Sequence, residues 1–486
     1  MTTSELAELF VQLYGPGPIH ALRAPARINI LGEHIDYVSY LPTASLTFGS
    51  REHAMVMLFR HAETGRIRGA STLSEYPAFE FTPDEGPGKT VGGPPQDSWT
   101  GFLYSRLTPA PHWGNYVKGS VYFARHKYAR QIEHGFDFLV DSSIPAGGGA
   151  SSSSALVVLS GAAVRAVNGI DCGAEELARD SSQAEWYMGT RGGAMDHLTI
   201  CLSKARHAVH IRYPGQGVDL VDAPSGPFRW VTFFSHAADK GSEVMLQYNE
   251  RAAVSRILIP AIIEKWKYSD PSRARAWQDA LFLLPTDFAA AVATLERLVN
   301  ELPLAMTVVE LSESYPDALA QCRRAFPALL RDSFRGSLKI RARAFHHLGE
   351  ISRVAEAVRL FHKMSEIGAT DPSNEIDEAM QSVGVLLGQS HLSLRDFYEV
   401  CTDEVDRLMD IIESDSSVYG ARLMGGGFGG NVLVLTAAEN VKPVTERVQA
   451  EYYGPRLRDA AKEGSIMVST PGDGLAVLEV GEPESG

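Results

Sequence analysis

The sequence predicts a mixed α and β protein with more than one domain. Apolar or alternating runs typical of strands occur over residues 24–60 and 136–142. A largely helical pattern fills most of residues 240–410. The chain has 486 residues, of which 44% are hydrophobic, which is more than one core usually needs.

The sequence pattern predicts the order of several helices and strands. Residues 136–142, FDFLVDS, place apolar and acidic side chains on opposite faces, as a strand does. The run ALVVLSGAAVRAV shortly after it is apolar on nearly every side, which predicts a buried helix. Further segments are predicted as a helix over 113–130, a helix over 174–188, and strands over 207–213 and 229–235.

Composition and the N-terminal sequence argue against several classes of function. The formal net charge of −14 argues against a nucleic-acid partner. The first 15 residues predict a short amphipathic helix with Ser4 as its N-cap, and no apolar stretch reaches the length of a membrane span. The four cysteines form no C-x-x-C pair, so no zinc or disulfide framework is visible. We expect a cytoplasmic protein with no membrane partner.

A glycine and serine loop at 145–154 is the strongest single motif. Its glycines allow backbone N–H groups to turn inward, and the following helix adds its free N–H groups and the positive end of its dipole. This arrangement predicts a cradle for a triphosphate, with serine hydroxyls near a magnesium ion. The alternative, a flexible linker, does not fit between a strand and a wholly apolar helix. The loop lacks the Gly-Lys ending of a Walker A motif.

Two further constellations are weaker when taken alone. Glu33, His34 and Asp36 follow an apolar strand closely enough to hydrogen-bond several sugar hydroxyls, although a solvated loop with a capping Asp is an equal alternative. Asp196 follows a Gly-Gly pair, which allows close approach of a substrate to a potential base. Glu185 lies on the preceding predicted helix and would face the same cavity.

The order of these pieces resembles the motif series of the GHMP kinases. The series is RINILGEHIDY, PAGGGASSSSAL, GGAMDH and GARLMGGGFGGNV. Other segments resemble the galactokinase branch of that superfamily: WGNYVKG at 113–119, AEWYMG at 184–189, Tyr248-Asn-Glu-Arg251, His346 with Glu350, and residues 390–408. The resemblance extends from about residue 15 to residue 437.

The resemblance implies an α+β, two-lobed GHMP kinase fold with the active site between the lobes. The lobes are expected at 1–225 and 226–486, the second with a longer helical section near 268–335 to which the pattern assigns no role. The implied activity is ATP-dependent phosphorylation of the anomeric hydroxyl of a monosaccharide, galactose first. The implied cofactors are ATP and Mg²⁺, and the chain is expected to be a monomer or a weak homo-oligomer.

The resemblance also implies residue roles. Asp196 matches the catalytic carboxylate, and Arg27 matches the cation beside it, which should lower the pKa of Asp196. The implied sugar contacts are Glu33, His34, Asp36, Gly193 and Tyr248. The implied ATP contacts are Gly147, Gly148, Gly149, Ser151, Ser152 and Ser153, with Ser153 and Glu185 as magnesium ligands and the glycine loop 425–430 as the floor of the site.

Several positions depart from the family pattern. Val38-Ser39-Tyr40 replaces the usual Asn-Gly-Gly, Ala150 and an extra Ser154 stand in the serine run, and His197 replaces Gln. The bulkier 38–40 loop is expected at the rim of the sugar site. These departures leave open a kinase for a heptose, arabinose, a uronic acid or an N-acetylhexosamine. A catalytically silent sugar sensor is a further alternative, against which the retained Arg27, Asp196, Glu185 and serine run argue.

Overall fold

The fold is described from a computed structural model. It describes residues 1–83, 99–104, 109–189, 191–215, 217–224, 226–237, 242–326, 329, 336–367, 374–456 and 465–480. The chain divides into two compact units. Unit 1 comprises Met1–Ile28, Phe48–His207 and Ser469–Gly486, and unit 2 comprises Asn29–Thr47 and Ala208–Val468. These units are interleaved along the chain, whereas the lobes expected at 1–225 and 226–486 are a consecutive division and stay a prediction.

Unit 1 contains a mixed sheet. The strands follow the order β15-β1-β2-β5-β3-β4, with β14 also paired to β2. Strand β5 is antiparallel to β2 and parallel to β3. The strands are β1 (His20–Leu31), β2 (Thr43–Ala62), β3 (Ile67–Ser71), β4 (Phe79–Phe81), β5 (Gly135–Ser142), β14 (Pro471–Gly472) and β15 (Ala476–Leu478), of which β1 and β2 run on into unit 2.

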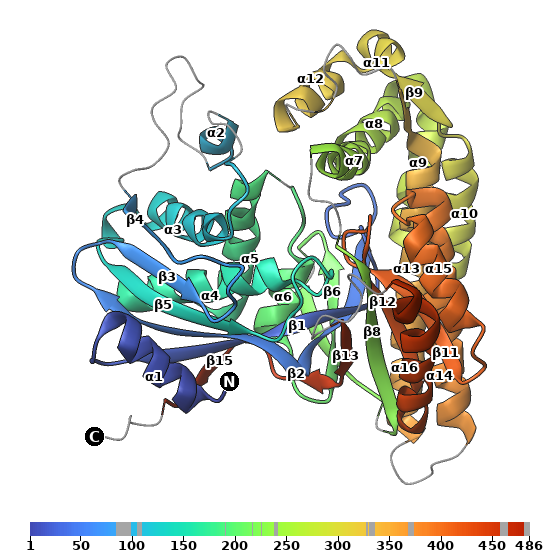
Figure 1. The fold of residues 1–486 in the computed structure, drawn as a ribbon. Coiled ribbons are helices and arrows are strands. Elements are labelled where there is room, and N and C mark those ends of the chain that lie inside the picture. The colour runs from blue at the N-terminus through green and yellow to red at the C-terminus, as the bar shows by residue number, and fades with distance from the viewer. Residues whose placement is uncertain are drawn as a thin grey trace. The chain divides into compact units, whose positions relative to one another are not determined.

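Helices cover both faces of this sheet (Figure 1). One face carries α3, α4 and α5, and the other carries α1. The helices are α1 (Thr3–Tyr14), α2 (Trp99–Tyr104), α3 (Gly114–Tyr128), α4 (Ser152–Val167), α5 (Ala174–Glu185) and α6 (Met195–Leu202). Helix α1 buries Leu6 and Phe10 against the sheet.

The N-cap prediction for α1 was wrong by two residues. The cap is Thr2, whose hydroxyl accepts a hydrogen bond from the Glu5 backbone N–H, while the Glu5 carboxylate accepts one from the Thr2 N–H. This reciprocal pair is a capping box, which satisfies two N–H groups that the first turn of a helix leaves without partners. Ser4 therefore lies inside the helix.

Unit 2 combines a small sheet with long helices. Its four-stranded sheet has the order β11-β12-β8-β13, and β6 pairs with β7 and with the first residues of β2. The strands are β6 (His207–Tyr213), β7 (Gly217–Asp222), β8 (Phe228–His236), β9 (Ala305–Thr307), β10 (Ser337–Lys339), β11 (Val418–Met424), β12 (Gly430–Ala437) and β13 (Ile466–Ser469).

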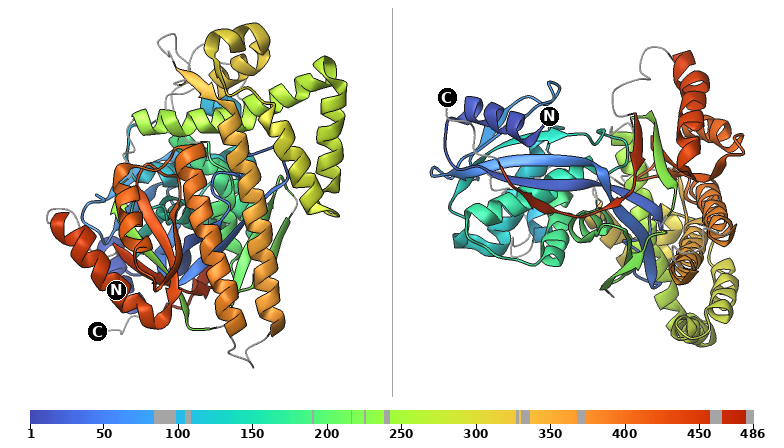
Figure 2. Two further views of the ribbon diagram at one scale, coloured as in Figure 1. Left: turned by 90° about the vertical axis from the view of Figure 1, so that its right-hand side faces the viewer. Right: turned by 90° about the horizontal axis from the view of Figure 1, so that it is seen from below.

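The helices of unit 2 confirm the helical pattern predicted for 240–410. They are α7 (Ser242–Ala253), α8 (Ile259–Ser269), α9 (Pro271–Leu283), α10 (Phe288–Asn300), α11 (Val308–Ser314), α12 (Pro316–Ala325), α13 (Ile340–Ile367), α14 (Asn374–Ser393), α15 (Asp403–Glu413) and α16 (Val441–Val448). The long helices α13 and α14 lie side by side (Figure 2). Helix α14 lies directly on β11, because a Cβ on Gly420 would come within 2.0 Å of the Gly384 carbonyl oxygen.

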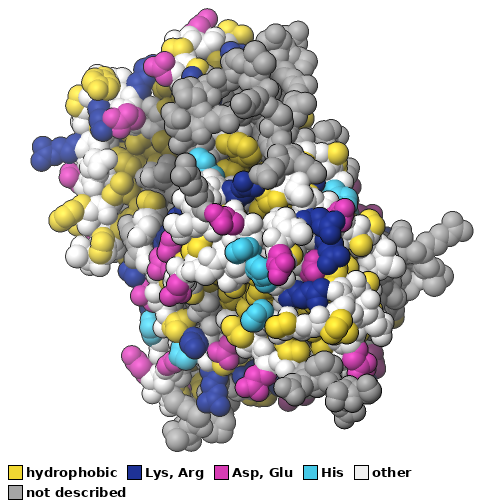
Figure 3. All heavy atoms as spheres, turned by 90° about the vertical axis from the view of Figure 1, so that its left-hand side faces the viewer, with side chains coloured by type: hydrophobic (Ala, Val, Ile, Leu, Met, Phe, Trp, Pro, Cys, Tyr) yellow, Lys and Arg dark blue, Asp and Glu magenta, His cyan; other side chains and the backbone are white. Residues whose placement is uncertain are grey.

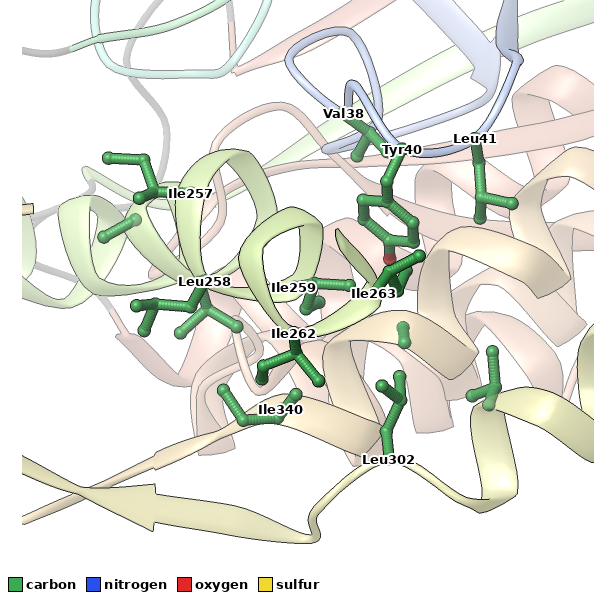
Figure 4. Close-up of a cluster of buried hydrophobic side chains, with 14 of the residues drawn as sticks. Val38, Tyr40, Leu41, Ile257, Leu258, Ile259, Ile262, Ile263, Leu302 and Ile340 are labelled. Atoms are coloured by element: carbon green, nitrogen blue, oxygen red, sulfur yellow. The ribbon is translucent and has the colours of Figure 1, made fainter. Parts of the chain in front are cut away.

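Part of the predicted helical section 268–335 belongs to the same apolar cluster as the unusual 38–40 loop. Figure 4 shows Tyr40 reaching from the loop toward Ile263 on α8, with Val38 and Leu41 beside it. Val38 is 2% exposed and Tyr40 8%, and the Tyr40 ring lies 6.2 Å from the ring of Trp277 on α9. The bulk of the loop is therefore core rather than rim, contrary to the sequence-based expectation. Residues 327–328 and 330–335 lie outside the described part of this section.

The observed architecture confirms the predicted α+β class. Strands β1, β5, β6 and β8 and helices α3, α4 and α5 occupy the predicted ranges, whereas the short pair β9 and β10 was not predicted. No helix in the described part of the chain is long and apolar enough to cross a membrane. On the face shown in Figure 3, acidic and basic side chains are interspersed among the described residues.

Candidate active site

The glycine and serine loop of unit 1 ends at the N-terminus of α4. Gly147, Gly149 and Ser151 have φ values of 74°, 76° and 64°, in the left-handed region that glycine adopts without strain. The first hydrogen bond of α4 joins the Ala155 N–H to the Ser151 carbonyl oxygen at 2.9 Å. The N–H groups of residues 152–154 therefore precede the helical ladder and, with the dipole of a 16-residue helix, suit an anion.

Arg27 joins this loop to Asp196. Its Nε donates to Asp196 Oδ1 at 2.7 Å, and its Nη1 donates to the Gly149 carbonyl oxygen at 3.0 Å. Its backbone N–H also donates to the Ala150 carbonyl oxygen at 3.2 Å. The residue is 3% exposed, so one buried cation fixes the position of Asp196 relative to the loop.

Asp196 lies in the first turn of α6 and is held at both oxygens. Its Oδ2 accepts the Ser151 hydroxyl at 2.6 Å, and the Ser154 hydroxyl lies 3.5 Å from the same oxygen. Burial raises the pKa of Asp196, but the Arg27 charge and the hydrogen bonds from Arg27 and Ser151 outweigh it and hold the pKa below its usual range. This is the direction expected from the sequence. The side chain remains 27% exposed, so an ionised carboxylate faces partly outward.

Glu185, at the end of α5, contacts the extra serine of the loop. Its Oε2 accepts the Ser154 hydroxyl at 2.8 Å and lies 2.9 Å from Nε2 of His197. Burial raises the pKa of Glu185, but His197 and Ser154 outweigh it, so the pKa is lowered. Burial raises the pKa of Tyr116, and hydrogen bonding from Ser153, the serine expected at the metal, partly offsets that rise. The sequence marked Ser154 and His197 as departures but gave them no role.

In unit 2, Glu33 is bound from several sides. Its Oε2 accepts hydrogen bonds from Arg422 Nη2 at 2.7 Å, Asn29 Nδ2 at 2.9 Å and the Gly425 N–H at 2.8 Å. Its side chain is 4% exposed. This oxygen of a predicted sugar contact is therefore used to hold the start of the 425–430 loop.

The 425–430 loop needs its glycines for two reasons. Gly425, Gly427, Gly429 and Gly430 all have positive φ angles. A Cβ on Gly427 would also come within 2.5 Å of the Val400 Cβ. The loop thus lies directly against the chain at Val400.

His34 is a buried, neutral imidazole, one nitrogen of which has no hydrogen-bond partner among the described residues. Its Nδ1 lies 3.0 Å from the Tyr37 hydroxyl, and its ring stacks on Tyr398 with centroids 4.8 Å apart. Burial, reinforced by the charges of Arg251 and Arg422, lowers the pKa of His34 to about 3. Its Nε2 has no hydrogen-bond partner among the described residues.

The structure divides the predicted sugar contacts between the units. Tyr248 lies in unit 2 with its ring 5.8 Å from that of His34, and the half-buried Asp36 is adjacent to Tyr37 in sequence. Gly193 belongs to unit 1, three residues before Asp196. The assignment of all five residues to one sugar site stays a prediction.

Several residues around His34 and Glu33 were not singled out from the sequence. Arg422 and Tyr398 are the main examples, and both lie in segments that were quoted only for their resemblance. Two residues noted for resemblance alone now have visible contacts. His346 Nε2 lies 3.0 Å from the Glu33 carbonyl oxygen, and Glu350 Oε2 accepts the Gly32 N–H at 2.8 Å.

Family models match three parts of the chain. Residues 115–204 match the GHMP kinases N terminal domain, and residues 375–454 match the GHMP kinases C terminal model. Residues 8–44 match the galactokinase galactose-binding signature. Segments in both halves of the chain are therefore similar to the GHMP kinases.

Individual similar proteins indicate which branch of the superfamily the chain resembles. The galactokinase of Chloroflexus aurantiacus is 27% identical over 99% of this chain and 99% of that protein, and the galactokinase of Bos taurus is 26% identical over 96% and 95%. The crystal structure of Lactococcus lactis galactokinase complexed with galactose superposes with a TM-score of 0.67 and 22% identity, covering 98% of this chain and 99% of that one. Together with the galactose-binding signature, these matches confirm the galactokinase-like branch that the motif series predicted.

Proposed function

We propose that this protein transfers the γ-phosphate of ATP to the anomeric hydroxyl of a neutral monosaccharide, with D-galactose as its main substrate. The observation that carries the proposal is the Arg27 guanidinium, which binds both Asp196 and the Gly149 carbonyl of the glycine and serine loop. One side chain thus fixes a carboxylate beside a loop suited to phosphates. The galactose-binding signature over residues 8–44 supports the choice of sugar.

Asp196 orients the attacking hydroxyl in this proposal. An ionised carboxylate accepts a hydrogen bond from the anomeric O–H and directs its oxygen lone pair at the γ-phosphorus. Because the pKa of Asp196 is lowered, the proton moves to it only as the new O–P bond forms and the hydroxyl becomes acidic. The bond between the γ-phosphorus and the bridging oxygen breaks, and ADP leaves with that oxygen.

Arg27 and the loop supply alignment and charge. Phosphoryl transfer depends on positioning and on neutralising the charge of the phosphates more than on covalent chemistry. Arg27 keeps the carboxylate at a fixed distance from the loop, and the N–H groups at the start of α4 face the phosphates. An Arg that held Asp196 without contacting the loop would lower its pKa but would not align it.

The residues beside Asp196 fit a magnesium ion. Glu185 has a lowered pKa, is 18% exposed, and is accompanied by serine hydroxyls, which are the hard oxygen donors that Mg²⁺ prefers. We propose Glu185 and Ser153 as ligands, with Ser154 orienting Glu185 through their 2.8 Å hydrogen bond. A magnesium ion bound there supplies charge neutralisation for the triphosphate.

A panel of free sugars tests the proposal. The intact protein is incubated with ATP, Mg²⁺ and one sugar at a time, and ADP release is followed. We expect the highest kcat/KM for D-galactose and none for D-galacturonate, because the half-buried carboxylate of the predicted contact Asp36 would repel an anionic sugar. Strong activity on a uronic acid with none on any neutral sugar would overturn the proposal. ADP release with no sugar in the panel, despite measurable sugar binding, would favour the silent sensor.

A further inference from the structure

Six buried polar side chains of unit 2 form one unbranched chain of hydrogen bonds. We call it the tyrosine–histidine relay. Its members come from the loop after β1, from α13, and from two π-helical turns at Val254–Leu258 and Leu394–Tyr398. In order they are Tyr40, His347, Ser255, Tyr398, Tyr37 and His34.

The first half of the relay begins in the apolar cluster. The Tyr40 hydroxyl lies 2.6 Å from His347 Nδ1. His347 Nε2 lies 3.1 Å from the Ser255 hydroxyl, which in turn lies 3.1 Å from the Tyr398 hydroxyl. His347, Ser255 and Tyr398 are each 0% exposed, so water does not compete for these links.

The second half ends at the predicted sugar site. The Tyr398 and Tyr37 hydroxyls lie 2.8 Å apart, and the Tyr37 hydroxyl lies 3.0 Å from His34 Nδ1. Ser255 and Tyr398 are each part of a π-helical turn, a feature that occurs frequently at functional sites. The relay therefore connects the unusual 38–40 loop to the ring of His34, whose Nε2 is buried without a partner among the described residues.

Counting protons shows that the relay has a surplus. Burial lowers the pKa of both His34 and His347, so each imidazole is neutral and carries one N–H. The six groups thus hold six protons for five links. One proton has no link to fill.

The surplus proton is confined to one end of the relay. His347 cannot hold the surplus proton. Both of its ring nitrogens lie in links of the relay, so the one N–H of the neutral ring always fills a link. None of the three inner hydroxyls has a third hydrogen-bond partner in the described part of the chain, so a proton turned away from the relay would be buried and unbonded. The remaining positions are the Tyr40 hydroxyl and His34 Nε2.

The two ends are not equivalent. Tyr40 is surrounded by apolar side chains of α8 and α9, and His347 is the one hydrogen-bond partner of its hydroxyl among the described residues (Figure 4). A proton stranded there would leave two buried groups unbonded, the Tyr40 O–H and the lone pair of His34 Nε2, and both are unfavourable. With the surplus proton on His34 Nε2, only that buried N–H is unbonded in the ligand-free protein, and an oxygen of a ligand that reaches it can accept the proton.

We infer that Tyr40 is a positioning residue that fixes His34 as the Nε2–H tautomer, a hydrogen-bond donor to an oxygen of the bound ligand. Tyr40 donates to His347, each hydroxyl donates to the next member, and Tyr37 donates to His34 Nδ1. The identity of that ligand as a sugar rests on the proposed function. The Asn-Gly-Gly stretch usual in the family has no phenol, so this control of His34 belongs to the unusual loop of this chain.

The inference states what His34 recognises. A ligand oxygen with a lone pair satisfies Nε2–H, whereas an ammonium or amide N–H in that position would leave two donors facing each other. The relay thus favours an accepting oxygen over a nitrogen donor at one position of the ligand.

The tautomer is measured directly by NMR. The full-length protein is labelled with ¹⁵N-histidine, and long-range ¹H–¹⁵N correlation spectra are recorded without sugar or nucleotide. His34→Gln identifies the His34 signals by their disappearance. We expect a single Nε2–H tautomer at His34 in the wild type. An Nδ1–H tautomer in the wild type would overturn the inference by itself, whatever the variants do.

Two variants and one control test the role of the relay. Tyr40→Phe removes the hydroxyl whose proton would be stranded. The remaining hydrogen bonds can then point in either direction at similar energy, so His34 should become a mixture of the Nδ1–H and Nε2–H tautomers. Ser255→Ala makes the buried Tyr398 hydroxyl the end of the links to His34, so a proton there would be stranded in turn and His34 should stay Nε2–H. Tyr453→Phe removes another buried phenol of unit 2, which donates to the Phe234 carbonyl oxygen at 2.8 Å, and should leave His34 unchanged. A pure Nε2–H tautomer in a folded Tyr40→Phe protein would refute the role of Tyr40.

Kinetics provide a second readout. Tyr40→Phe should raise the KM for galactose by about 3- to 10-fold with kcat within about twofold, because a neutral buried hydrogen bond is worth roughly 1 kcal/mol. Tyr453→Phe should leave both constants unchanged. Equal KM values in the two variants would show that the tautomer does not affect the ligand. If no sugar is a substrate, the proposed function fails, while the ligand-free spectra still decide the tautomer.

Discussion

The two units use the same type of side chain for different purposes. In unit 1 the carboxylates of Asp196 and Glu185 remain 27% and 18% exposed, and their pKa values are lowered. In unit 2 the carboxylates of Glu33 and Glu350 are 4% and 0% exposed and accept backbone N–H groups as well as arginine. The first pair is available to a ligand, whereas the second pair holds loops in place. The surroundings of a carboxylate, rather than its residue type, therefore determine whether it can meet a ligand or stabilises the fold.

The largest effect should come from breaking the buried pair of unit 2. Glu33→Gln removes the carboxylate that directly binds the Arg422 guanidinium, which is 0% exposed. Loss of one partner of a buried ion pair costs about 3–5 kcal/mol, so the free energy of unfolding measured with urea should fall by that amount. Glu356→Gln, in an exposed pair with Arg359, is the matched control and should change it by less than about 0.5 kcal/mol. Similar losses in the two variants would remove the architectural role of Glu33.

Asp196→Asn tests the other side of the comparison. It removes the charge that orients the attacking hydroxyl, so kcat should fall by at least ~10²-fold, while ATP binding changes little. Asp141→Asn is the control, since Asp141 in unit 1 is 25% exposed and pairs with the N-terminus. Turnover near that of the wild type in a folded Asp196→Asn protein would exclude Asp196 from the chemistry.

A pH titration should separate the architectural carboxylates further. The Arg353 charge, together with His346 and Arg422, outweighs burial and lowers the pKa of Glu350 from 4.5 to about 2. A lowered pKa contributes stability that is present above pH 4.5 and is lost as the pH falls through 2. The wild type should therefore lose up to about 1.4 kcal/mol per pH unit more than Glu350→Gln in this window. Parallel curves for the two proteins would contradict the assignment.

Magnesium dependence should give the smallest effect. Glu185→Gln should raise the Mg²⁺ concentration for half-maximal rate by about 10-fold, because it removes the anionic oxygen ligand. Ser153→Ala and Ser154→Ala should each raise it by about 3-fold, through loss of a ligand and loss of orientation of Glu185, respectively. An unchanged titration in all three variants would place the ion elsewhere.

The sequence predicted the secondary-structure elements more completely than the residue contacts of the site. Helix α4 followed from its apolar run and β5 from alternation, since both signals are local. The Thr2 cap was missed, although Thr2 and Glu5 have the spacing of a capping box. Arg27 and Asp196 lie 169 residues apart, and the motif series, not a local pattern, indicated their proximity.

The relay could not be predicted from the sequence, and the reason is physical. Tyr40 and His347 are separated by 307 residues, and neither belongs to a motif that specifies the other. The loop 38–40 was recognised as unusual, but its burial depends on packing against α8 and α9, which no local periodicity reveals. For the same reason Glu33 was expected at the sugar, without its bonds to Arg422 and Gly425.

The position of the phosphate on the product tests the central claim most directly. The protein is incubated with D-galactose, ATP and Mg²⁺, and the product is examined by ³¹P NMR. The account predicts a phosphate ester coupled to the anomeric proton, formed at least ~10²-fold more slowly by Asp196→Asn than by Asp141→Asn. A phosphate on another hydroxyl, or equal rates in the two variants, would contradict the assignment of Asp196 to phosphoryl transfer at the anomeric oxygen.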